Sequence, residues 1–286
     1  MESAQKLKKE LRLNIELVDL LDVLKGMAAS EFRALERQKR RFVEFHDAFA
    51  GFFRMIDFST ITHPFASDFL GKLGIIMVTS DEGFMGGLNT RVIQTALNLR
   101  GADSAELIVI GERGAGYLRG LGRDFVEFPG IASNERYETS LKIRDFIMKE
   151  ALGGRFSRLL MVYPKPISFT VQHTETLTIL PCSELFHKTE KPANIIKHLI
   201  LESSVDHLIE YLLGTWIAYK LYEVFEDSKL AEFSARTVHL EESHQVLSRR
   251  TDQVQYQYFR SHHEHVDRSM REMFSSRLIR KKKKKD

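Results

Sequence analysis

Two glycine-bearing segments are the parts of this chain most similar to a phosphate-binding site. ERGAGYLRG (112–120) follows one apolar run and carries Gly114 and Gly116, and DEGFMGGLN (81–89) follows another. Loops of this kind hold phosphates on backbone N–H groups where a strand leads into a helix. The first does not complete G-x-G-x-x-G, and neither supplies the lysine of G-x-x-x-x-G-K-[ST]. The pattern favours tight strand-to-helix turns over a nucleotide site.

The histidines do not have the spacing of a metal site or a catalytic site. His262, His263 and His265 are close in sequence, but neighbouring positions on a helix project from different faces. His239 and His244 are five residues apart, whereas a helical zinc pair needs a spacing of four. Ser80-Asp81 has no histidine near it in sequence to activate the hydroxyl. We therefore expect no catalytic residue, no bound metal and no cofactor.

Composition and charge exclude several classes of protein. The 286 residues include 42 Lys and Arg against 39 Asp and Glu, a net charge of +3. Five of the positive charges are the run Lys281–Lys285, and without residues 281–286 there are 37 basic and 38 acidic residues. The body of the chain is not a basic nucleic-acid binder, and the lysine run is expected to be a solvated tail.

Three features concern compartment and membrane. Cys182 is the sole cysteine, so no intrachain disulfide forms, which fits a reducing compartment. No apolar run reaches 18 residues, and the beginning of the chain, MESAQKLKKELR, lacks the apolar stretch of a signal peptide. If the protein works at a membrane, we expect a partner to hold it there.

The distribution of proline and glycine predicts two long terminal helices. All six prolines lie between Pro64 and Pro192, and no glycine follows Gly214. Both residue types interrupt helices. Apolar residues of the first arm recur at intervals of three and four, at Val18, Leu21, Ala28, Phe32 and Leu35 with an irregularity at Lys25, then at Phe42, Phe45, Phe49, Phe52 and Ile56. This is the seam of a coiled coil.

The second arm has the same period but is half polar. Its seam runs through Phe233, Thr237, Leu240, His244, Leu247, Thr251, Val254, Tyr258, Ser261 and His265. The two arms are therefore expected to pair as an antiparallel coiled coil. The polar far end of the second arm suits the polar surface of a partner better than a dry core.

The middle of the chain reads as α/β. Apolar or β-branched runs at 73–80, 106–111, 158–166 and 168–181 predict strands, and helices are expected near 90–99 and 139–151. Strands alternating with helices indicate a Rossmann-like, mostly parallel sheet. The predicted organisation is a first helix over 1–60, an α/β domain over 65–192, a helical arm over 193–280 and a basic tail over 281–286.

Three short motifs resemble the gamma subunit of F-type ATP synthases. VLKGMAASEFR (23–33) is similar to that family's N-terminal helix, SDEGFMGGLN (80–89) to the end of its first strand, and AEFSARTV (231–238) to the start of its C-terminal helix. The resemblance covers residues 5 to 276, and the 80–89 motif is the most specific. The segment 214–233 looks like the divergent, alternative branch of these ATPases.

Two departures from the family pattern lie near the C-terminus. In YFRSHHEHVDRSM (258–270), Tyr258, Val266 and Met270 fit, but His262 and His263 stand where the family has Arg-Gln. The chain also ends in lysines where the family ends near small apolar residues. These differences indicate a divergent gamma subunit, working with a modified catalytic head.

The resemblance implies a non-catalytic rotor in the central stalk, coupling rotation of a membrane ion-translocating ring to ATP synthesis or hydrolysis. It implies alpha and beta subunits, an epsilon-type subunit and a ring of c subunits as partners, no nucleic acid, and a peripheral position on the cytoplasmic face of a bacterial or archaeal plasma membrane. Residues implied to contact the alpha/beta hexamer are Leu24, Lys25, Ala28, Arg33, Glu232, Arg236, Tyr258, His262 and His263. Those implied to form a structural turn are Ser80, Asp81, Gly83, Gly86, Gly87 and Asn89.

Two other functions stay open at this point. One is a non-catalytic coiled-coil adaptor with a Rossmann-like insert, unrelated to rotation. The other is a nucleotide-dependent enzyme that uses the loops at 80–89 and 111–120. Co-purification with an alternating hexamer of P-loop ATPase subunits distinguishes the rotor from the adaptor, and a nucleotide titration tests the enzyme.

Overall fold

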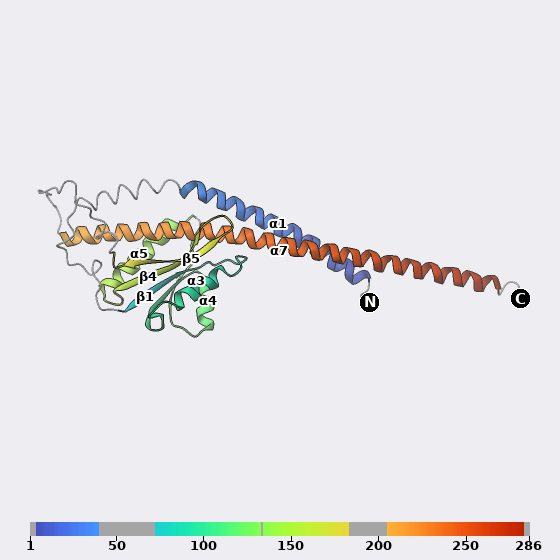
Figure 1. Cartoon of the computed structure of the whole chain (residues 1–286), viewed down its shortest axis with the longest axis horizontal. Helices are drawn as coiled ribbons and strands as arrows, with labels where there is room; N and C mark the ends of the chain where they lie inside the picture. Colours follow the sequence, from blue (N-terminus) through green and yellow to red (C-terminus); the bar gives the residue numbers. More distant parts are fainter. Residues whose placement is uncertain (1–3, 40–71, 133, 183–204, 283–286) are drawn as a thin grey trace. The chain divides into compact units, whose positions relative to one another are not determined.

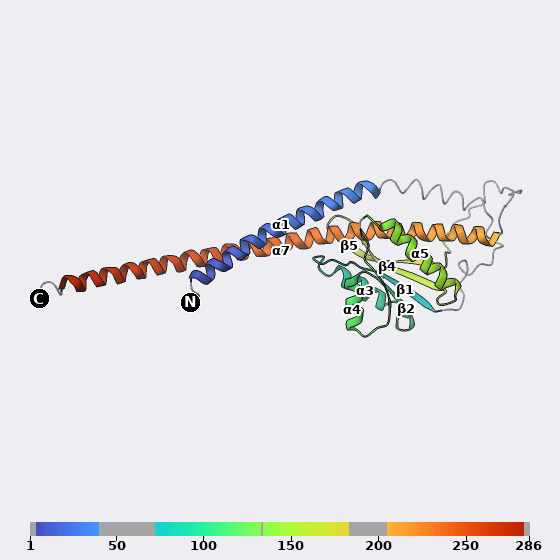
Figure 2. The same cartoon turned by 180° about the vertical axis from the view of Figure 1, so that it is seen from behind.

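The computed structural model describes residues 4–39, 72–132, 134–182 and 205–282. Figures 1 and 2 show the elements from opposite sides. In chain order they are α1 (Ala4–Lys39), β1 (Leu73–Val78), α3 (Leu88–Leu97), the short 3-10 helix η2 (Ala102–Ser104), β2 (Glu106–Ile110), α4 (Glu112–Gly120), β3 (Val126–Phe128), α5 (Arg136–Leu152), β4 (Arg158–Pro166), β5 (Gln172–Leu180) and α7 (Val205–Lys282). The chain divides into two compact units, one of Met1–Met27 with His239–Asp286 and one of Ala28–Val238.

The larger unit, Ala28–Val238, contains a five-stranded sheet in the order β3-β2-β1-β4-β5. The pairs β1–β2, β1–β4 and β2–β3 are parallel, and β4–β5 is antiparallel. The strand order reverses direction between β1 and β4. In doubly wound sheets a reversal of this kind opens a crevice at the carboxyl ends of the two strands, where ligands bind.

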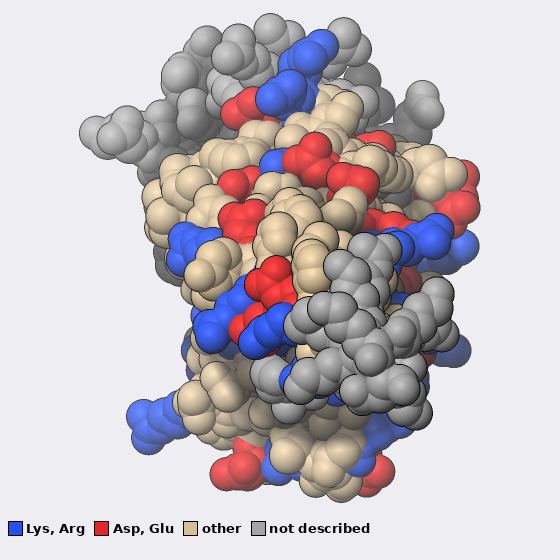
Figure 3. All heavy atoms as spheres, turned by 90° about the vertical axis from the view of Figure 1, so that its right-hand side faces the viewer, with Lys and Arg blue, Asp and Glu red and all other residues tan. Residues whose placement is uncertain are grey.

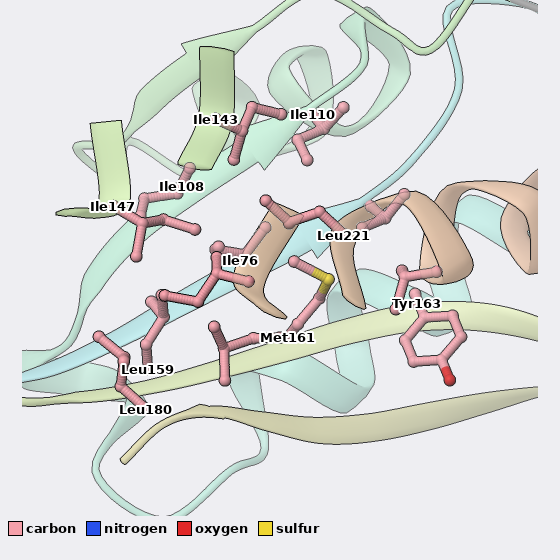
Figure 4. Close-up of a cluster of buried hydrophobic side chains, with 14 of the residues drawn as sticks. Ile76, Ile108, Ile110, Ile143, Ile147, Leu159, Met161, Tyr163, Leu180 and Leu221 are labelled. Carbon is pink, nitrogen blue, oxygen red and sulfur yellow. The ribbon is translucent and has the colours of Figure 1, made fainter. Parts of the chain in front are cut away.

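The two faces of the sheet are covered by different helices. On one face, Ile75 and Met77 of β1 pack with apolar residues of α3 and α4. On the other face, Ile76 meets Ile143 and Ile147 of α5 and Leu221 of α7, as Figure 4 shows. Successive strand residues point to opposite faces, so one apolar run supplies both cores.

Alpha helices α1 and α7 pair antiparallel in the smaller unit, Met1–Met27 with His239–Asp286. Arg250 pairs with Glu10 at 3.0 Å, and Glu241 pairs with Lys25 at 3.0 Å. The later residue of α1 therefore contacts the earlier residue of α7, which makes the two helices antiparallel. Every predicted seam residue of α7 from Leu240 to Ser261 in this unit is buried or half-buried, and His265 is exposed. The irregular position Lys25 lies in the seam of α1 and uses its ammonium group to bind Glu241.

The fold class predicted from the sequence is confirmed: a mostly parallel α/β sheet follows one long terminal helix and precedes another. The predicted seam from Phe42 to Ile56, the start of the second arm at 193–204 and the end of the lysine run lie outside the described residues. The three-residue strand β3 was not predicted, because Val126–Phe128 is too short to show a pattern. None of the described helices is both long enough and apolar enough to cross a membrane.

Candidate functional site

The glycine-bearing segment 112–120 is a helix, and the turn lies just before it. Gly111 has a φ of +102°, and α4 begins at the next residue. A Cβ atom at Gly111 would lie 2.5 Å from the carbonyl oxygen of Thr79. Glycine is therefore needed at this turn by its conformation and by the close approach of β1, and no phosphate is required to explain it.

Thr79, just after β1, and Asp81, in the SDEGFMGGLN segment, hydrogen-bond to the elements beside β1. Thr79 donates its hydroxyl to the carbonyl of Ile110 at 2.7 Å and accepts from the N–H of Gly114 at 3.1 Å. The carboxylate of Asp81 accepts from the N–H of Glu112 at 2.8 Å and of Gly130 at 3.1 Å. Asp81 therefore occupies the amino terminus of α4, where a bound anion would otherwise be favoured.

The rest of this segment folds onto α3. The Asn89 amide donates to the hydroxyl of Ser80 at 2.9 Å and accepts from its N–H at 3.3 Å. Gly86 has a positive φ of 57° and Gly87 is the residue before α3, while Gly83 lies against Arg113. Of the residues expected to form a structural turn, Ser80, Asp81, Gly83, Gly86 and Gly87 lie in the loop between β1 and α3, and Asn89 lies in the first turn of α3.

Phe84 in this loop was not identified from the sequence. Its φ of 64° is the left-handed conformation, which is rare for a bulky side chain, and its ring is 60% exposed. Met85 in the same loop is buried against Leu88 and Ala235. No pattern in the sequence signals either arrangement.

Arg236 binds to the same loop. Its guanidinium forms ion pairs with Glu82 at 2.7 Å and Glu232 at 2.8 Å, and it donates to the Gly83 carbonyl at 3.4 Å. Lys229 pairs with Glu232 at 2.8 Å. The Arg236 side chain is only 12% exposed, so in this chain its charge is used mainly within the molecule.

The crevice at the strand-order reversal is largely filled. A hollow with a cavity volume of about 10 Å³, room for about one water molecule, remains at the carboxyl ends of β1 and β4. Its lining comes from the ends of β1 and β4, the β1–α3 loop, the start of α3, the segment before α5, and α7: Val78, Thr79, Ser80, Met85, Leu88, Asn89, Ile131, Pro164, Ser228, Lys229 and Glu232. Binding pockets for organic ligands are usually larger, roughly 300–1,000 Å³. Helix α7 and Met85 thus occupy the place where related sheets hold a nucleotide.

In the smaller unit, Leu24 is half-buried and Lys25 links both helices. Lys25 also pairs with Asp22 at 2.7 Å. Its hydrogen bond lowers the pKa of Asp22, and hydrogen bonds from Gln245 and then Lys25 lower the pKa of Glu241. In the larger unit, Ala28 is buried in the helix seam and Arg33 is exposed.

The remaining predicted contact residues lie on α7 in the smaller unit. Tyr258 is half-buried and its ring stacks on His262 at 5.9 Å, and His263 is exposed. From His262 to Ser276 every residue is exposed, including apolar Val266, Met270 and Phe274. This stretch of helix has no covering element among the described residues, so its apolar side chains are available to a partner.

In the part of the chain that the structure describes, no three His, Cys, Asp or Glu side chains gather as a metal site would require. On the face shown in Figure 3, acidic and basic side chains are interspersed, without the single-sign field of a nucleic-acid binder. The sequence did not identify Glu82, Arg136, Glu226 or Ser234, because each depends on a partner distant in sequence.

Comparison with known proteins agrees with this architecture. The family model described as ATP synthase matches residues 5–276. The ATP synthase gamma chain of Desulforudis audaxviator is 24% identical over 208 residues, covering 68% of this chain and 70% of that protein. That of Thiobacillus denitrificans is 25% identical over 245 residues, covering 80% and 84%.

Solved structures show the same fold at lower identity. A chain of the Euglena gracilis mitochondrial ATP synthase superposes with a TM-score of 0.69 at 12% identity, covering 96% of this chain and 94% of that one. A chain of the Tetrahymena thermophila mitochondrial ATP synthase, from the central stalk and c-ring, gives 0.59 at 18% identity, covering 78% and 99%. The family model and the two gamma-chain relatives confirm the resemblance first based on three short motifs.

Proposed function

Because the chain belongs to the ATP synthase gamma-chain family, we propose that its own working role is that of a shaft turned by a membrane ring. A gamma chain is a non-catalytic subunit in the central stalk of an F-type ATP synthase. The observation that carries the proposal is the family match over residues 5–276, which includes both long helices and the sheet between them. The adaptor and the nucleotide-dependent enzyme are not favoured.

The geometry suits a part that transmits torque. Within each unit α1 and α7 interlock antiparallel, through Lys25–Glu241 in one and through Phe32 and Leu35 against Leu230 and Phe233 in the other. Side chains that interdigitate along a seam resist twisting better than a single helix. The sheet with its helices offers a broad surface through which a driving ring can act.

The partners follow from the same role. Alpha and beta subunits would surround the exposed end of α7, where Tyr258, His262 and His263 are presented. Lys25, Leu24, Ala28, Arg33, Glu232 and Arg236 remain predicted contacts with these subunits. Glu232 and Arg236 also form an ion pair with each other within α7. The α/β unit would meet an epsilon-type subunit and the ring of c subunits.

A gamma chain is a peripheral component of its complex. We place this one on the cytoplasmic face of a bacterial or archaeal plasma membrane, held there by its partners. The bacterial origin of its relatives, Desulforudis audaxviator and Thiobacillus denitrificans among them, supports this placement.

Purification of the tagged full-length chain from its own cells tests the proposal. We expect P-loop ATPase subunits and a membrane ring to be recovered with it, and the isolated chain to hydrolyse no ATP. Recovery of a coiled-coil partner without ATPase subunits would instead identify an adaptor. ATP hydrolysis by the chain alone would identify an enzyme.

A further inference from the structure

One segment of α7 is buried on every side. From Val224 to Thr237 each residue is buried except Lys229 and Arg236, which are half-buried. The segment includes charged and polar residues, among them Glu226 at 2%, Asp227 at 4% and Ser234 at 0% exposure. A helix lying on one surface keeps a polar outer face. This segment, which we call the gripped segment, is instead enclosed by several elements of the unit Ala28–Val238.

Helix α5 holds the gripped segment by a buried ion pair. Arg136, at the start of α5, approaches Glu226 to 2.6 Å, and the two side chains are only 9% and 3% exposed. Burial, and then the charge of Glu226, raise the pKa of the adjacent Tyr222. Removing one partner of such a pair leaves an uncompensated charge in the interior. The pair therefore defines one position of α7 on α5.

The β4–β5 hairpin holds the segment from a second direction. The Ser234 hydroxyl donates to the carbonyl of Phe169 and accepts from the amide of Gln172 at 2.6 Å. A third contact is the β1–α3 loop, where Arg236 binds Glu82 and where Met85 packs on Ala235.

Helix α1 closes the remaining side. Phe32 and Leu35 pack against Leu230 and Phe233. The Phe32 ring also meets Phe169 of the hairpin edge to face, with centroids 4.9 Å apart. We call these four elements, the start of α5, the β4–β5 hairpin, the β1–α3 loop and residues 32–35 of α1, the collar.

We propose that the collar is the place where the α/β unit grips α7 and passes torque to it. Apolar helix packing alone permits a helix to move by one turn past its neighbour. Buried polar pairs exclude such slippage, because each displaced group would lose its partner inside the protein. Glu226 and Ser234 make such contacts with α5 and the hairpin, and Arg236 adds an ion pair to the exposed Glu82, so polar contacts from three elements oppose both rotation and axial movement of α7. The inference rests on the proposed role as a rotor.

The ratio of ions pumped to ATP hydrolysed by the assembled complex tests the collar. The variant Glu226→Gln combined with Ser234→Ala removes contacts to α5 and to the hairpin. We expect ATP hydrolysis to be retained while ATP-driven pumping falls severalfold, because α7 turns without driving the α/β unit. The matched control combines Glu223→Gln and Thr215→Val, both outside the gripped segment. Glu223 pairs with Lys220 and the Thr215 hydroxyl donates to the Tyr211 carbonyl, both within α7, so pumping should stay normal.

Exchanging the charges of Arg136 and Glu226 distinguishes loss of this contact from a general loss of folding. Arg136→Glu alone should lose pumping or assembly, and adding Glu226→Arg should restore both. Normal pumping per ATP by the Glu226→Gln/Ser234→Ala variant would overturn the collar. If that variant does not assemble, the variant Gln172→Ala/Ser234→Ala is measured in its place. A normal ratio of ions pumped to ATP hydrolysed in this second variant would also overturn the collar.

Hydrogen exchange on the isolated full chain distinguishes failure of the grip from failure of the rotor assignment. Amides of 224–237 should be better protected than those of 262–276, and the Glu226→Gln/Ser234→Ala variant should lose that excess. Absence of the excess in the unaltered chain would refute the collar whatever complex the chain joins. If residues 224–237 are better protected but no ATPase subunits are recovered with the chain, the rotor assignment is refuted while the collar contacts on α7 are supported.

Discussion

At the scale of single residues, groups that suggest chemistry in the sequence serve packing in the structure. Asp81 caps α4 and also accepts from Gly130, and a Cβ atom at Gly130 would lie 2.4 Å from that carboxyl group. Gly114 makes a similar close contact, with a Cβ position 2.4 Å from the Thr79 hydroxyl. These residue types are selected by close approach between elements rather than by a ligand.

Two glycines five positions apart should respond in opposite ways to alanine. Gly111→Ala forces a side chain onto a φ of +102° and against the Thr79 backbone, so we expect it to destabilise the protein by about 2 kcal/mol or more. Gly116 lies within α4 with nothing within 4 Å of its Cβ position. Gly116→Ala should stabilise by about 0.5–1 kcal/mol. Urea unfolding of the full chain measures both, and equal effects would contradict the assignment of the turn to Gly111.

At the scale of elements, the helix seam is regular even where the residues are polar. Buried or half-buried positions on α1 recur by three and four at Ala4, Leu7, Leu11, Asn14, Val18, Leu21, Lys25, Ala28, Phe32 and Leu35. Lys25 finds Glu241, but Asn14 is 8% exposed and its amide nitrogen has no hydrogen-bond partner among the described residues. A single polar seam residue lowers stability and specifies register.

Asn14→Leu should therefore strengthen the helix pair and weaken its specificity. We expect stability to rise by about 1–2 kcal/mol, since an unpaired buried amide is removed. Distances between spin labels on α1 and α7 should become more broadly distributed. Gln5→Leu, at an exposed position of the same helix, is the control and should change stability by less than about 0.5 kcal/mol. A loss of stability in Asn14→Leu would show that the amide has a partner.

At the scale of the whole molecule, the sheet topology of nucleotide-binding proteins is present without their open crevice. The strand order reverses between β1 and β4, yet Met85, Ser228 and Glu232 line what remains of the hollow there. The same helix that fills the crevice is the helix that the collar grips. Because α7 fills the crevice between β1 and β4, the fold holds a structural helix at the place where nucleotide-binding proteins hold a ligand.

We therefore expect the isolated chain to bind neither ATP nor ADP. Calorimetric titration of the full chain should show no saturable heat, because α7 would have to leave the sheet before a nucleotide entered. A purified ATPase head measured in parallel serves as the positive control. Micromolar binding that disappears on changing Gly86 and Gly87 to valine would revive the nucleotide-dependent enzyme.

The sequence by itself determined the elements and the family. Breaker-free arms predicted helices, seam periodicity predicted their pairing, and continuous apolar runs predicted β1, β2 and β4 as buried strands. These signals are local, since helix and strand periods repeat over a few residues. The same holds for the 80–89 motif, whose glycines mark a turn that neighbouring residues already require.

Tertiary structure alone decided which residues act together. Glu82 with Arg236, Arg136 with Glu226, and Ser234 with Gln172 are each separated by 62 residues or more. Nothing in the sequence near Glu226 or Ser234 distinguishes a gripped helix from one exposed along its outer face. Burial on all sides depends on four elements from separate parts of the chain meeting around α7. The residue pattern of one segment does not predict where the other three elements lie in space.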